Sequence, residues 1–294
     1  MEPMEYKEKS ETKMEKETQW DRTRLLLGEE GFQKLQHSFV LIAGCGAVGG
    51  FAIESLARAG VGHLALVDFD KVALSNINRQ IFALHSTLNR PKTYVAKERI
   101  ADIAPSCKVD VFDTFICQET MDDIFKNPPD FAVDAIDSLV SKALLIEELE
   151  KRNIPFISSM GAARKTDTSL IKVDKMKKTS VCPLAGKLRK ILRQRGVSLD
   201  FLCVYSLENA KNSVSDLQED KNPFCLSQKK AEQDKKDKKN ENAQNPPNLE
   251  KARIFSQRSA LGSLPTVTGI FGLTLANEAI KHLLQNKVRI DKKE

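Results

Sequence analysis

The sequence has no pair of cysteines in the spacing C-x-x-C, although its 294 residues include six cysteines, at positions 45, 107, 117, 182, 203 and 225. Structural zinc sites are commonly built from such pairs, and small disulfide-stabilised folds need a regular cysteine framework. The sequence therefore predicts neither a zinc site nor a set of disulfides, and we expect reduced thiols in the cytoplasm.

Other patterns are absent too. No apolar stretch opens the chain, so we expect no secretory signal. No G-x-x-x-x-G-K-[ST] motif occurs, which excludes a Walker-type ATPase. The uncharged run over 259–277 is borderline in length for a membrane span and is interrupted by Pro265 and three glycines. A helix over 261–284 that is buried, or packed at a subunit interface, is favoured over membrane association.

Strongly polar segments bound the foldable part of the chain. Residues 1–19 contain six Glu and four Lys, and residues 209–256 are rich in Lys, Asn, Asp and Gln. Such segments bury too little apolar surface to fold, so we expect a disordered tail over 1–19, a flexible insertion over 209–256 and a second tail over 286–294. Residues 20–285 are long enough for one large α/β domain or two small ones, and we favour one.

Strand and helix patterns alternate along the first half of the chain. Apolar runs predict strands at 39–43, 64–68, 108–114, 131–136 and 154–158. Helices are predicted between them at 48–59, 91–104 and 138–152, with Ser138 as a cap. This alternation implies a Rossmann-like, doubly wound and mostly parallel sheet with helices on both faces. A strand at 169–173, a basic helix at 184–195 and a strand at 201–206 are expected to extend it as a second sheet region.

A glycine-rich turn follows the first strand. Gly44, Gly46 and Gly49 form the pattern G-x-G-x-x-G between a strand and a helix. The first glycine permits the tight turn, the second lets the backbone approach a phosphate, and the third permits close packing of the helix. Asp68 ends the second strand, about where a ribose-binding acid belongs. The pattern predicts a nucleotide site, but many doubly wound proteins carry it.

A cluster of amides and cations after the second strand indicates which nucleotide binds. It consists of Asn76, Asn78, Arg79, Gln80 and Lys92. Nicotinamide enzymes do not need such groups directly after the ribose acid. The cations would meet the β- and γ-phosphates of a triphosphate, and the charge that develops on them during transfer. The cluster therefore favours ATP.

A carboxylate near the fourth strand is the candidate metal ligand. Asp137, expected at the end of that strand, could hold Mg²⁺, which bridges phosphate oxygens. Asp134 competes for this role, although strand alternation would place it on the opposite face from Asp137.

Positive charge is concentrated in one segment. Residues 164–195 contain eleven Lys or Arg against two acids, a formal charge of +9. Because the whole chain carries +6, the remainder nets −3. Concentrated positive charge suits a polyanionic partner, although a solvated helix face is the plainer interpretation.

Taken together, these strings resemble the ThiF/MoeB adenylyltransferases of the ubiquitin-activating-enzyme-like superfamily. More closely, the chain resembles the bacterial tRNA threonylcarbamoyladenosine dehydratases. The strings are GCGAVGG, VDFD, SNINRQ, RPK and DAIDS, supported by RTRLLLGEEGFQKL at 22–35, PLAGKLRKILR at 183–193 and GSLPTVTGIFGLTLANEAIK at 262–281. The resemblance covers residues 20–208 and 256–285.

The resemblance implies an ATP site and a homodimer. It places ATP on the glycine turn, ribose on Asp68, phosphates on Asn78, Arg79 and Lys92, and Mg²⁺ on Asp137. Arg22 matches an arginine that, in relatives, reaches the neighbouring subunit's ATP site, with an ordinary surface arginine as the alternative. A monovalent cation and a sulfur-relay partner protein stay open.

The implied reaction cyclises threonylcarbamoyladenosine beside the tRNA anticodon. ATP adenylates the free carboxylate and releases pyrophosphate; an internal atom of the modification then displaces AMP, so water is lost overall. The enzyme would mainly position the reactants and neutralise charge. The basic segment becomes the expected tRNA surface, with Arg164, Lys165, Lys178, Lys187, Arg189, Lys190 and Arg193 as its contacts.

Two departures from the family pattern and three rival functions stay in view. The missing C-x-x-C pairs fit the dehydratase branch, and Cys182 stands where the family commonly has an acid. A small, partly buried residue is favoured there over a catalytic thiol. The rivals are an adenylyltransferase for a ubiquitin-like sulfur carrier ending in Gly-Gly, an NAD-binding redox or sensor protein, and a non-catalytic nucleotide-binding scaffold.

Overall fold

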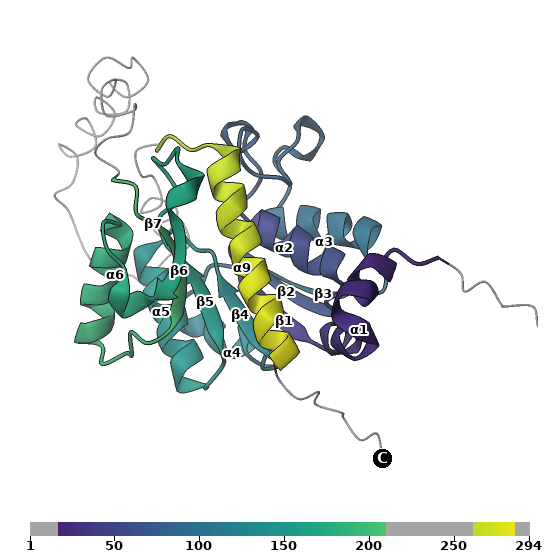
Figure 1. The fold of residues 1–294 in the computed structure, drawn as a ribbon. Coiled ribbons are helices and arrows are strands. Elements are labelled where there is room, and N and C mark those ends of the chain that lie inside the picture. Colours follow the sequence, from purple (N-terminus) through teal and green to yellow (C-terminus); the bar gives the residue numbers. More distant parts are fainter. Residues whose placement is uncertain (1–16, 210–260, 286–294) are drawn as a thin grey trace, which may run out of the picture.

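The computed structural model describes residues 17–209 and 261–285 (Figure 1). Of the expected tail over 1–19, only the last three residues are described, and they are exposed. The expected insertion over 209–256 lies outside the described residues except for Asn209, and the expected tail over 286–294 lies outside them entirely.

One seven-stranded sheet forms the centre of the molecule, with the strand order β3-β2-β1-β4-β5-β7-β6. Six neighbouring strands are parallel, and β6 at the edge is antiparallel to β7. The strands are β1 (Phe39–Ala43), β2 (His63–Asp68), β3 (Lys108–Asp113), β4 (Phe131–Asp134), β5 (Phe156–Ser159), β6 (Ile171–Lys175) and β7 (Leu202–Ser206). The two late strands therefore extend the parallel sheet, and the expected α/β fold is confirmed.

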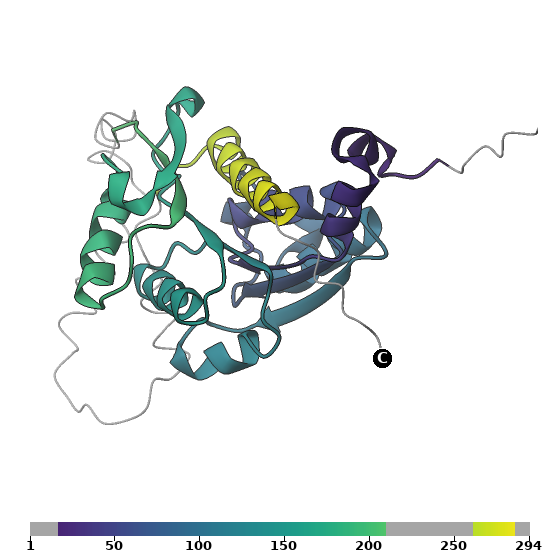
Figure 2. The ribbon, with the colours of Figure 1, turned by 60° about the horizontal axis from the view of Figure 1, so that its bottom comes forward.

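Helices cover both faces of the sheet (Figures 1 and 2). The helices are α1 (Asp21–Gln36), α2 (Gly49–Ala59), α3 (Lys92–Ile103), α4 (Met121–Ile124), α5 (Leu139–Lys151), α6 (Pro183–Gln194) and α9 (Pro265–Gln285). Strand alternation divides the core: Val40 and Ile42 of β1 pack with α2, α3 and α9, whereas Leu41 and Ala43 pack with α4 and α5. Figure 2 shows α9, in yellow, on the opposite side of the sheet from α4 and α5.

The C-terminal helix is a buried helix, as expected. Most of the apolar residues of α9 face α2 and the sheet, and Val267, Phe271 and Leu275 are fully buried. At Gly272 an added Cβ would lie 2.3 Å from the carbonyl oxygen of Val48, so α2 and α9 meet backbone to backbone. Within 17–209 and 261–285, no helix has the length and apolar character needed to cross a membrane.

Some expected details of the elements differ from the observed ones. Strand β4 ends at Asp134, two residues earlier than predicted, because β1 gives way to the glycine turn after Ala43 and Asp134 is its last pairing partner. Strand β6 lies two residues later than predicted. Ser138 is the N-cap residue of α5, but its side chain makes no capping hydrogen bond.

Strand order reverses between β1 and β4. In an open parallel sheet, this reversal leaves a crevice at the carboxyl ends of the strands, because the following segments diverge to opposite faces. The glycine turn after β1 and Asp68 at the end of β2 lie at this edge, and the turn after β4 closes it on the other side.

Candidate nucleotide-binding site

Two glycines of the turn are required by close backbone contacts. Gly44 has φ +97°, a left-handed conformation that favours glycine, and an added Cβ there would lie 2.8 Å from the carbonyl oxygen of Ala135. At Gly49 an added Cβ would lie 1.7 Å from the carbonyl oxygen of Gly44. The turn therefore folds back on itself and packs against the segment that follows β4.

Gly46 is different, because nothing within the chain demands a glycine there. The nearest atom to an added Cβ is Nε2 of Gln80, at 3.8 Å, which is ordinary contact. The backbone of Gly46 does not have positive φ. The space beside it could therefore receive a phosphate close to the backbone, with the buried side chain of Gln80 next to it.

The carboxylate of Asp68 joins the glycine turn to the end of β2. One oxygen accepts the backbone N–H of Cys45 at 2.7 Å, and the other accepts that of Asp70 at 2.8 Å. Burial raises the pKa of Asp68, although the positive charge of Lys92 opposes this shift. Burial also raises the pKa of the Cys45 thiol well above its ordinary value, and the Asp68 charge adds to that effect. Cys45 is therefore no nucleophile at neutral pH.

Lys92 lies beside a carboxylate that the sequence reasoning missed. Its Nζ is 2.8 Å from Oδ2 of Asp70, and the residue is only 5% exposed. Burial by itself lowers the pKa of Lys92, but the charges of Asp68 and Asp70 outweigh it and raise the pKa. The spacing i, i+2 in the string VDFD could have indicated that both acids point the same way.

The loop after β2 carries the remaining amides and the arginine. Oδ1 of Asn76 accepts the N–H of Ala73 at 3.1 Å, so this side chain shapes the turn. Nη1 of Arg79 donates to the Ser75 carbonyl at 2.8 Å and to Oδ1 of Asn78 at 2.9 Å. The structure thus brings Arg79 and Asn78 together at the surface of the loop.

This loop is also tied to the segment that precedes α9. Nδ2 of Asn78 donates to the carbonyl oxygen of Ser263 at 3.2 Å. The adjacent carbonyl oxygen of Gly262 accepts the N–H of Arg164 at 2.8 Å. Residues 261–264 therefore connect the expected phosphate-binding loop with the start of the basic segment.

The two aspartates near β4 have different surroundings. Asp137 is exposed and lies in the turn before α5, three residues beyond the strand rather than at its end. Asp134 is fully buried, and its Oδ2 is 2.6 Å from Nζ of Lys142 and 2.6 Å from Oγ of Ser158. The oxygens of Asp134 are therefore occupied in the core, whereas Asp137 is at the surface.

A metal ion at this edge would need oxygens from a ligand. Among the described residues, no group of three or more His, Cys, Asp or Glu side chains could hold a metal by itself. Mg²⁺ is commonly bound by one or two carboxylates together with substrate phosphates and water. The exposed carboxylate of Asp137 fits that pattern.

Arg22 lies at the opposite edge of the sheet from these residues. The neighbouring Gln19 donates to the Ile103 carbonyl at the end of α3, and Trp20 lines a small cavity with Gly62 and Cys107, just before β2 and β3. The side chain of Arg22 is exposed. A single chain therefore does not bring Arg22 to the glycine turn.

The basic segment divides into exposed and engaged cations. On α6, Ala185, Leu188 and Leu192 are buried, whereas Lys187, Lys190 and Arg193 are exposed. These three cations are spaced three residues apart, so they share one face, and they form no ion pair with another described residue. We call them the α6 cationic face.

Other members of the expected tRNA surface have partners inside the protein. Lys165 is 3% exposed and donates to the Glu208 carbonyl, and burial lowers the pKa of Lys165. Arg189 donates to the carbonyl oxygen of Thr179 at 2.8 Å. These two side chains are consequently not free surface groups.

Acids inside and outside the segment pair with several of its cations. Lys178 pairs with Asp174 at 3.4 Å, and Arg195 pairs with Glu147 at 2.8 Å. Lys175 and Lys177 both contact Asp200, and their hydrogen bonds lower the pKa of Asp200 to about 2. The effective positive surface is therefore smaller than the formal charge suggests.

Cys182 and one cavity of the structure take no part in the candidate site. Cys182 is 4% exposed and packs in the core between α5 and α6, as a small buried residue.

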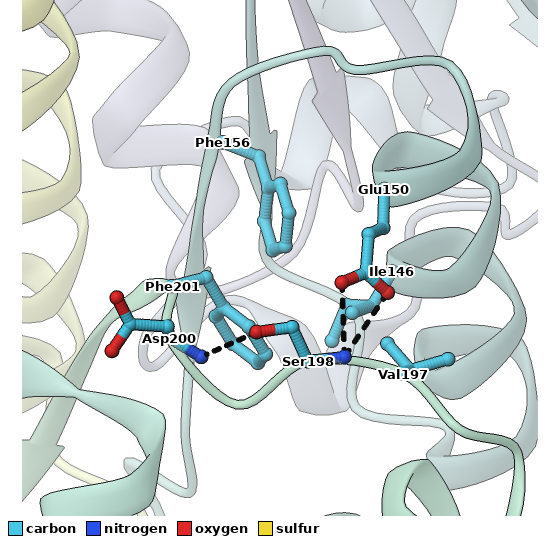
Figure 3. A pocket seen from close by; sticks show the side chains of 7 residues that line it. All are labelled: Ile146, Glu150, Phe156, Val197, Ser198, Asp200 and Phe201. Atoms are coloured by element: carbon cyan, nitrogen blue, oxygen red, sulfur yellow. Dashed lines mark hydrogen bonds between the residues drawn. The ribbon is translucent and has the colours of Figure 1, made fainter.

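A cavity of about 160 Å³ lies at the amino ends of β5 and β7, lined by Phe156, Phe201 and Glu150, among others (Figure 3). The Glu150 carboxylate accepts the N–H of Ser198 there, at 2.9 and 3.1 Å. This cavity is at the edge opposite the glycine turn.

Comparison with known proteins agrees with this geometry. Residues 20–293 match the model of the ThiF family. The chain is 42% identical over 191 residues to the tRNA threonylcarbamoyladenosine dehydratase of Bacillus subtilis (strain 168), covering 65% of this chain and 75% of that one. It is 32% identical over 274 residues to the enzyme of the same name from Escherichia coli (strain K12), covering 91% and 94%. The crystal structure of the E. coli enzyme, TcdA, in complex with ATP superimposes with a TM-score of 0.72 at 29% identity, covering 90% of this chain and 93% of that one.

Two glycines of the turn, Gly46 in open space and Gly44 in close contact with Ala135, provide a test that separates binding from folding. In Gly46→Ala we expect an unchanged thermal unfolding midpoint and an ATP affinity lower by about tenfold or more, because the methyl group occupies the space beside the backbone. In Gly44→Ala we expect a free energy of unfolding lower by about 2 kcal/mol, because of the left-handed backbone and the contact with Ala135. Calorimetric titration and thermal melts measure both quantities, and unchanged ATP affinity in Gly46→Ala contradicts this placement of the phosphate.

Proposed function

The chain belongs to the ThiF family, and we propose that it catalyses the ATP-dependent dehydration of threonylcarbamoyladenosine in tRNA. The observation that carries the proposal is the cluster at the carboxyl edge of the sheet, in a chain that spans 94% of the E. coli dehydratase. There a glycine turn with open space at Gly46 lies beside two acids and Lys92. Such a cluster suits the binding and activation of a triphosphate.

We propose that the nucleotide lies across the glycine turn with its ribose on Asp68. Each carboxylate oxygen of Asp68 already accepts one backbone N–H, and each has a second lone pair for a ribose hydroxyl. The bonds to Cys45 and Asp70 hold the carboxylate in place before the ribose arrives. The phosphates then follow the open backbone at Gly46, beside Gln80.

The loop after β2 and Lys92 would offset the negative charge of the phosphates. Asn78 and Arg79 are presented at the surface of the loop, whereas Asn76 supports the turn beneath them. Lys92 keeps its proton because two carboxylates lie beside it, so it supplies a fixed positive charge. Fixed charges of this kind stabilise the charge that develops on the phosphates in the transition state.

Magnesium belongs to this proposal through Asp137. When bound, Mg²⁺ neutralises charge on the phosphate oxygens. The exposed carboxylate of Asp137 would hold it together with those oxygens, since the described residues contain no protein cage for a metal. The proposal does not extend to a monovalent cation or a sulfur-relay protein, because no described feature supports either.

In the proposed reaction, an oxygen of the threonylcarbamoyl carboxylate attacks the α-phosphorus of ATP and pyrophosphate leaves. An internal nucleophile of the same modification then attacks the activated carbonyl carbon, closes a ring and releases AMP with that oxygen. A proton is lost from the nucleophile, so the sum is loss of water driven by conversion of ATP to AMP and pyrophosphate. The residues described above position ATP and offset its charge.

The α6 cationic face is the part of the basic segment that we propose for tRNA. Lys187, Lys190 and Arg193 project from a helix whose opposite side is anchored in the core. Phosphates of a structured RNA can approach such a face without displacing an internal partner. Residues 261–264 connect the start of the basic segment with Asn78, which fits one tRNA reaching both surfaces.

A homodimer completes the proposal. Leu25 and Leu26 follow Arg22 on α1 and are 83% and 82% exposed, an apolar pair that a second subunit would cover. Because Arg22 is remote from its own glycine turn, it could act only on a partner's nucleotide. A cytoplasmic location is also proposed, and it fits the five described cysteines, which are all free thiols.

The decisive experiment supplies purified protein with ATP, Mg²⁺ and tRNA that carries threonylcarbamoyladenosine. We expect AMP, pyrophosphate and a cyclised nucleoside eighteen mass units lighter, read by chromatography with mass spectrometry. Arg79→Ala should lower the rate by about 10² to 10³, because one charge-stabilising donor is lost. Arg90→Ala is the matched control, since that arginine pairs with Glu98 on α3 and its loss should leave the rate within about twofold.

Other products identify the rival functions. Pyrophosphate exchange that responds to a carrier protein ending in Gly-Gly, and not to modified tRNA, contradicts the proposal in favour of a sulfur-carrier adenylyltransferase. Tight NAD binding without ATP turnover favours a redox or sensor protein. Full activity in Arg79→Ala contradicts the proposal that the loop after β2 binds the phosphates of ATP.

The tRNA surface is tested by the salt dependence of binding. Replacing Lys187, Lys190 and Arg193 with Ala should weaken tRNA binding and reduce the slope of log Kd against log salt by about two to three, because each lost phosphate contact removes nearly one released counterion. Arg195→Ala is the control, since Arg195 pairs with Glu147. An unchanged slope in the triple variant contradicts the assignment of this face.

The role of Arg22 across subunits is tested by mixing two inactive variants. Arg22→Ala and Arg79→Ala should each be inactive alone, but a mixed dimer regains one intact site that combines Arg22 of one chain with Arg79 of the other. Activity after co-refolding should therefore recover to about a quarter of the wild-type value, which follows from random pairing. A monomeric mass in sedimentation, or no recovery, contradicts the shared site.

A further inference from the structure

A fully buried ion pair lies directly beneath the turn that carries Asp137. Asp134, the last residue of β4, and Lys142, in the second turn of α5, are both 0% exposed, and Nζ to Oδ2 is 2.6 Å. Oγ of Ser158 on β5 donates to the same carboxylate oxygen at 2.6 Å and is 3.3 Å from Nζ. Figure 1 shows α5 beside the two strands that carry these residues.

Such a pair is a poor way to stabilise a core. Removing two charges from water has a large desolvation cost, and well-packed apolar residues of similar size often stabilise a fold equally well. Ala143, Leu145 and Ile146 on the same helix are buried apolar residues, so an apolar core is available on both sides of Lys142. Stabilisation of the core therefore does not explain why positions 134 and 142 carry charged rather than apolar side chains.

The hydrogen bonds of the pair close a ring around Asp137. Oδ1 of Asp134 accepts the N–H of Ile136 at 3.1 Å, which bends the chain as it leaves β4. The N–H of Lys142 donates to the carbonyl oxygen of Ser138 at 2.9 Å, which fixes the first turn of α5. Asp137 lies between Ile136 and Ser138, which these two hydrogen bonds hold in place. The ion pair between Asp134 and Lys142 joins the two ends of this segment.

The same turn is in contact with the glycine turn. The N–H of Ala135 donates to the carbonyl oxygen of Ala43 at 2.8 Å, and the Ala135 carbonyl faces Gly44 where a Cβ would clash. A shift of the 135–138 turn would therefore move Asp137 relative to the backbone that receives the phosphates.

We infer that the Asp134–Lys142 ion pair positions the carboxylate of Asp137 so that it can contact a Mg²⁺ ion bound to the nucleotide. Asp134 and Lys142 touch neither nucleotide nor metal; they act through the backbone of residues 136–138. This inference rests on the proposed role of Asp137 at the nucleotide, and it assigns the geometry of that site to a pair of residues in the core.

The test measures how much Mg²⁺ tightens the binding of ATP to the full-length protein, without tRNA. Calorimetric titrations with ATP in excess Mg²⁺ and in EDTA give two Kd values, and their ratio is the Mg²⁺ gain. The principal variant is Asp134→Leu with Lys142→Met, an apolar pair that leaves no buried charge unpaired. Asp137→Asn sets the value expected when the carboxylate itself is lost.

In the double variant we expect the Kd without Mg²⁺ to stay within about twofold of wild type, while the Mg²⁺ gain falls about tenfold or more, toward the value for Asp137→Asn. Lys151→Met is the matched control, because that lysine of α5 pairs with Glu147 and Glu148 at the surface. It should retain the full gain. Thermal melts and circular dichroism confirm that each protein titrated is folded.

The outcomes separate the inference from the proposed reaction. A folded double variant with an unchanged Mg²⁺ gain overturns the inference, and a lowered melting temperature with unchanged gain shows a structural role only. An unchanged gain in Asp137→Asn overturns the inference together with the metal role of Asp137. Should the double variant not fold, Ser158→Ala tests the same network with one hydrogen bond removed: a reduced gain supports the inference and an unchanged one overturns it. Failure to dehydrate tRNA leaves all these titrations valid, since none of them uses tRNA.

Discussion

The proposed nucleotide site depends on one steric constraint, the backbone contact between the glycine turn and the turn after β4. Gly44 and Gly49 have no room for a Cβ, and Ala135 lies against both. This contact brings the carboxyl ends of β1 and β4 together where the strand order reverses. Asp68 adds the end of β2 by accepting the N–H of Cys45. Three strand ends therefore present one continuous backbone surface to a ligand.

Paired charges of both signs lie beside and beneath that surface. Lys92 stays protonated because Asp68 and Asp70 lie beside it, and Asp134 stays in the core because Lys142 and Ser158 satisfy it. Fixed charges inside a protein do not have to reorganise when a ligand charge arrives, which makes them effective electrostatic partners. These interactions, at the end of the sheet and in the core beneath it, thus hold the charged groups of the proposed site in fixed positions.

Local sequence patterns were sufficient for most of the fold and for the glycine turn at the centre of the proposed site. Apolar runs and helix signals placed the strands of the parallel sheet to within about two residues, as is usual for element boundaries. The glycine spacing located the turn, because Gly44 and Gly49 are needed for reasons local to a strand–turn–helix unit. Asp68, Asn78, Arg79 and Lys92 were proposed as site residues because they follow that unit closely along the chain.

What the amino-acid order determined by itself was therefore the sheet, the turn and the residue types gathered after it. Tertiary structure alone decided which of these groups have partners. It buried Lys165 against Glu208, engaged Arg189 with Thr179 and left the α6 cationic face exposed. It also joined Asp134 to Lys142 and Ser158. The physical reason is that burial and pairing depend on neighbours from other strands and helices, whose approach no periodicity within one segment encodes.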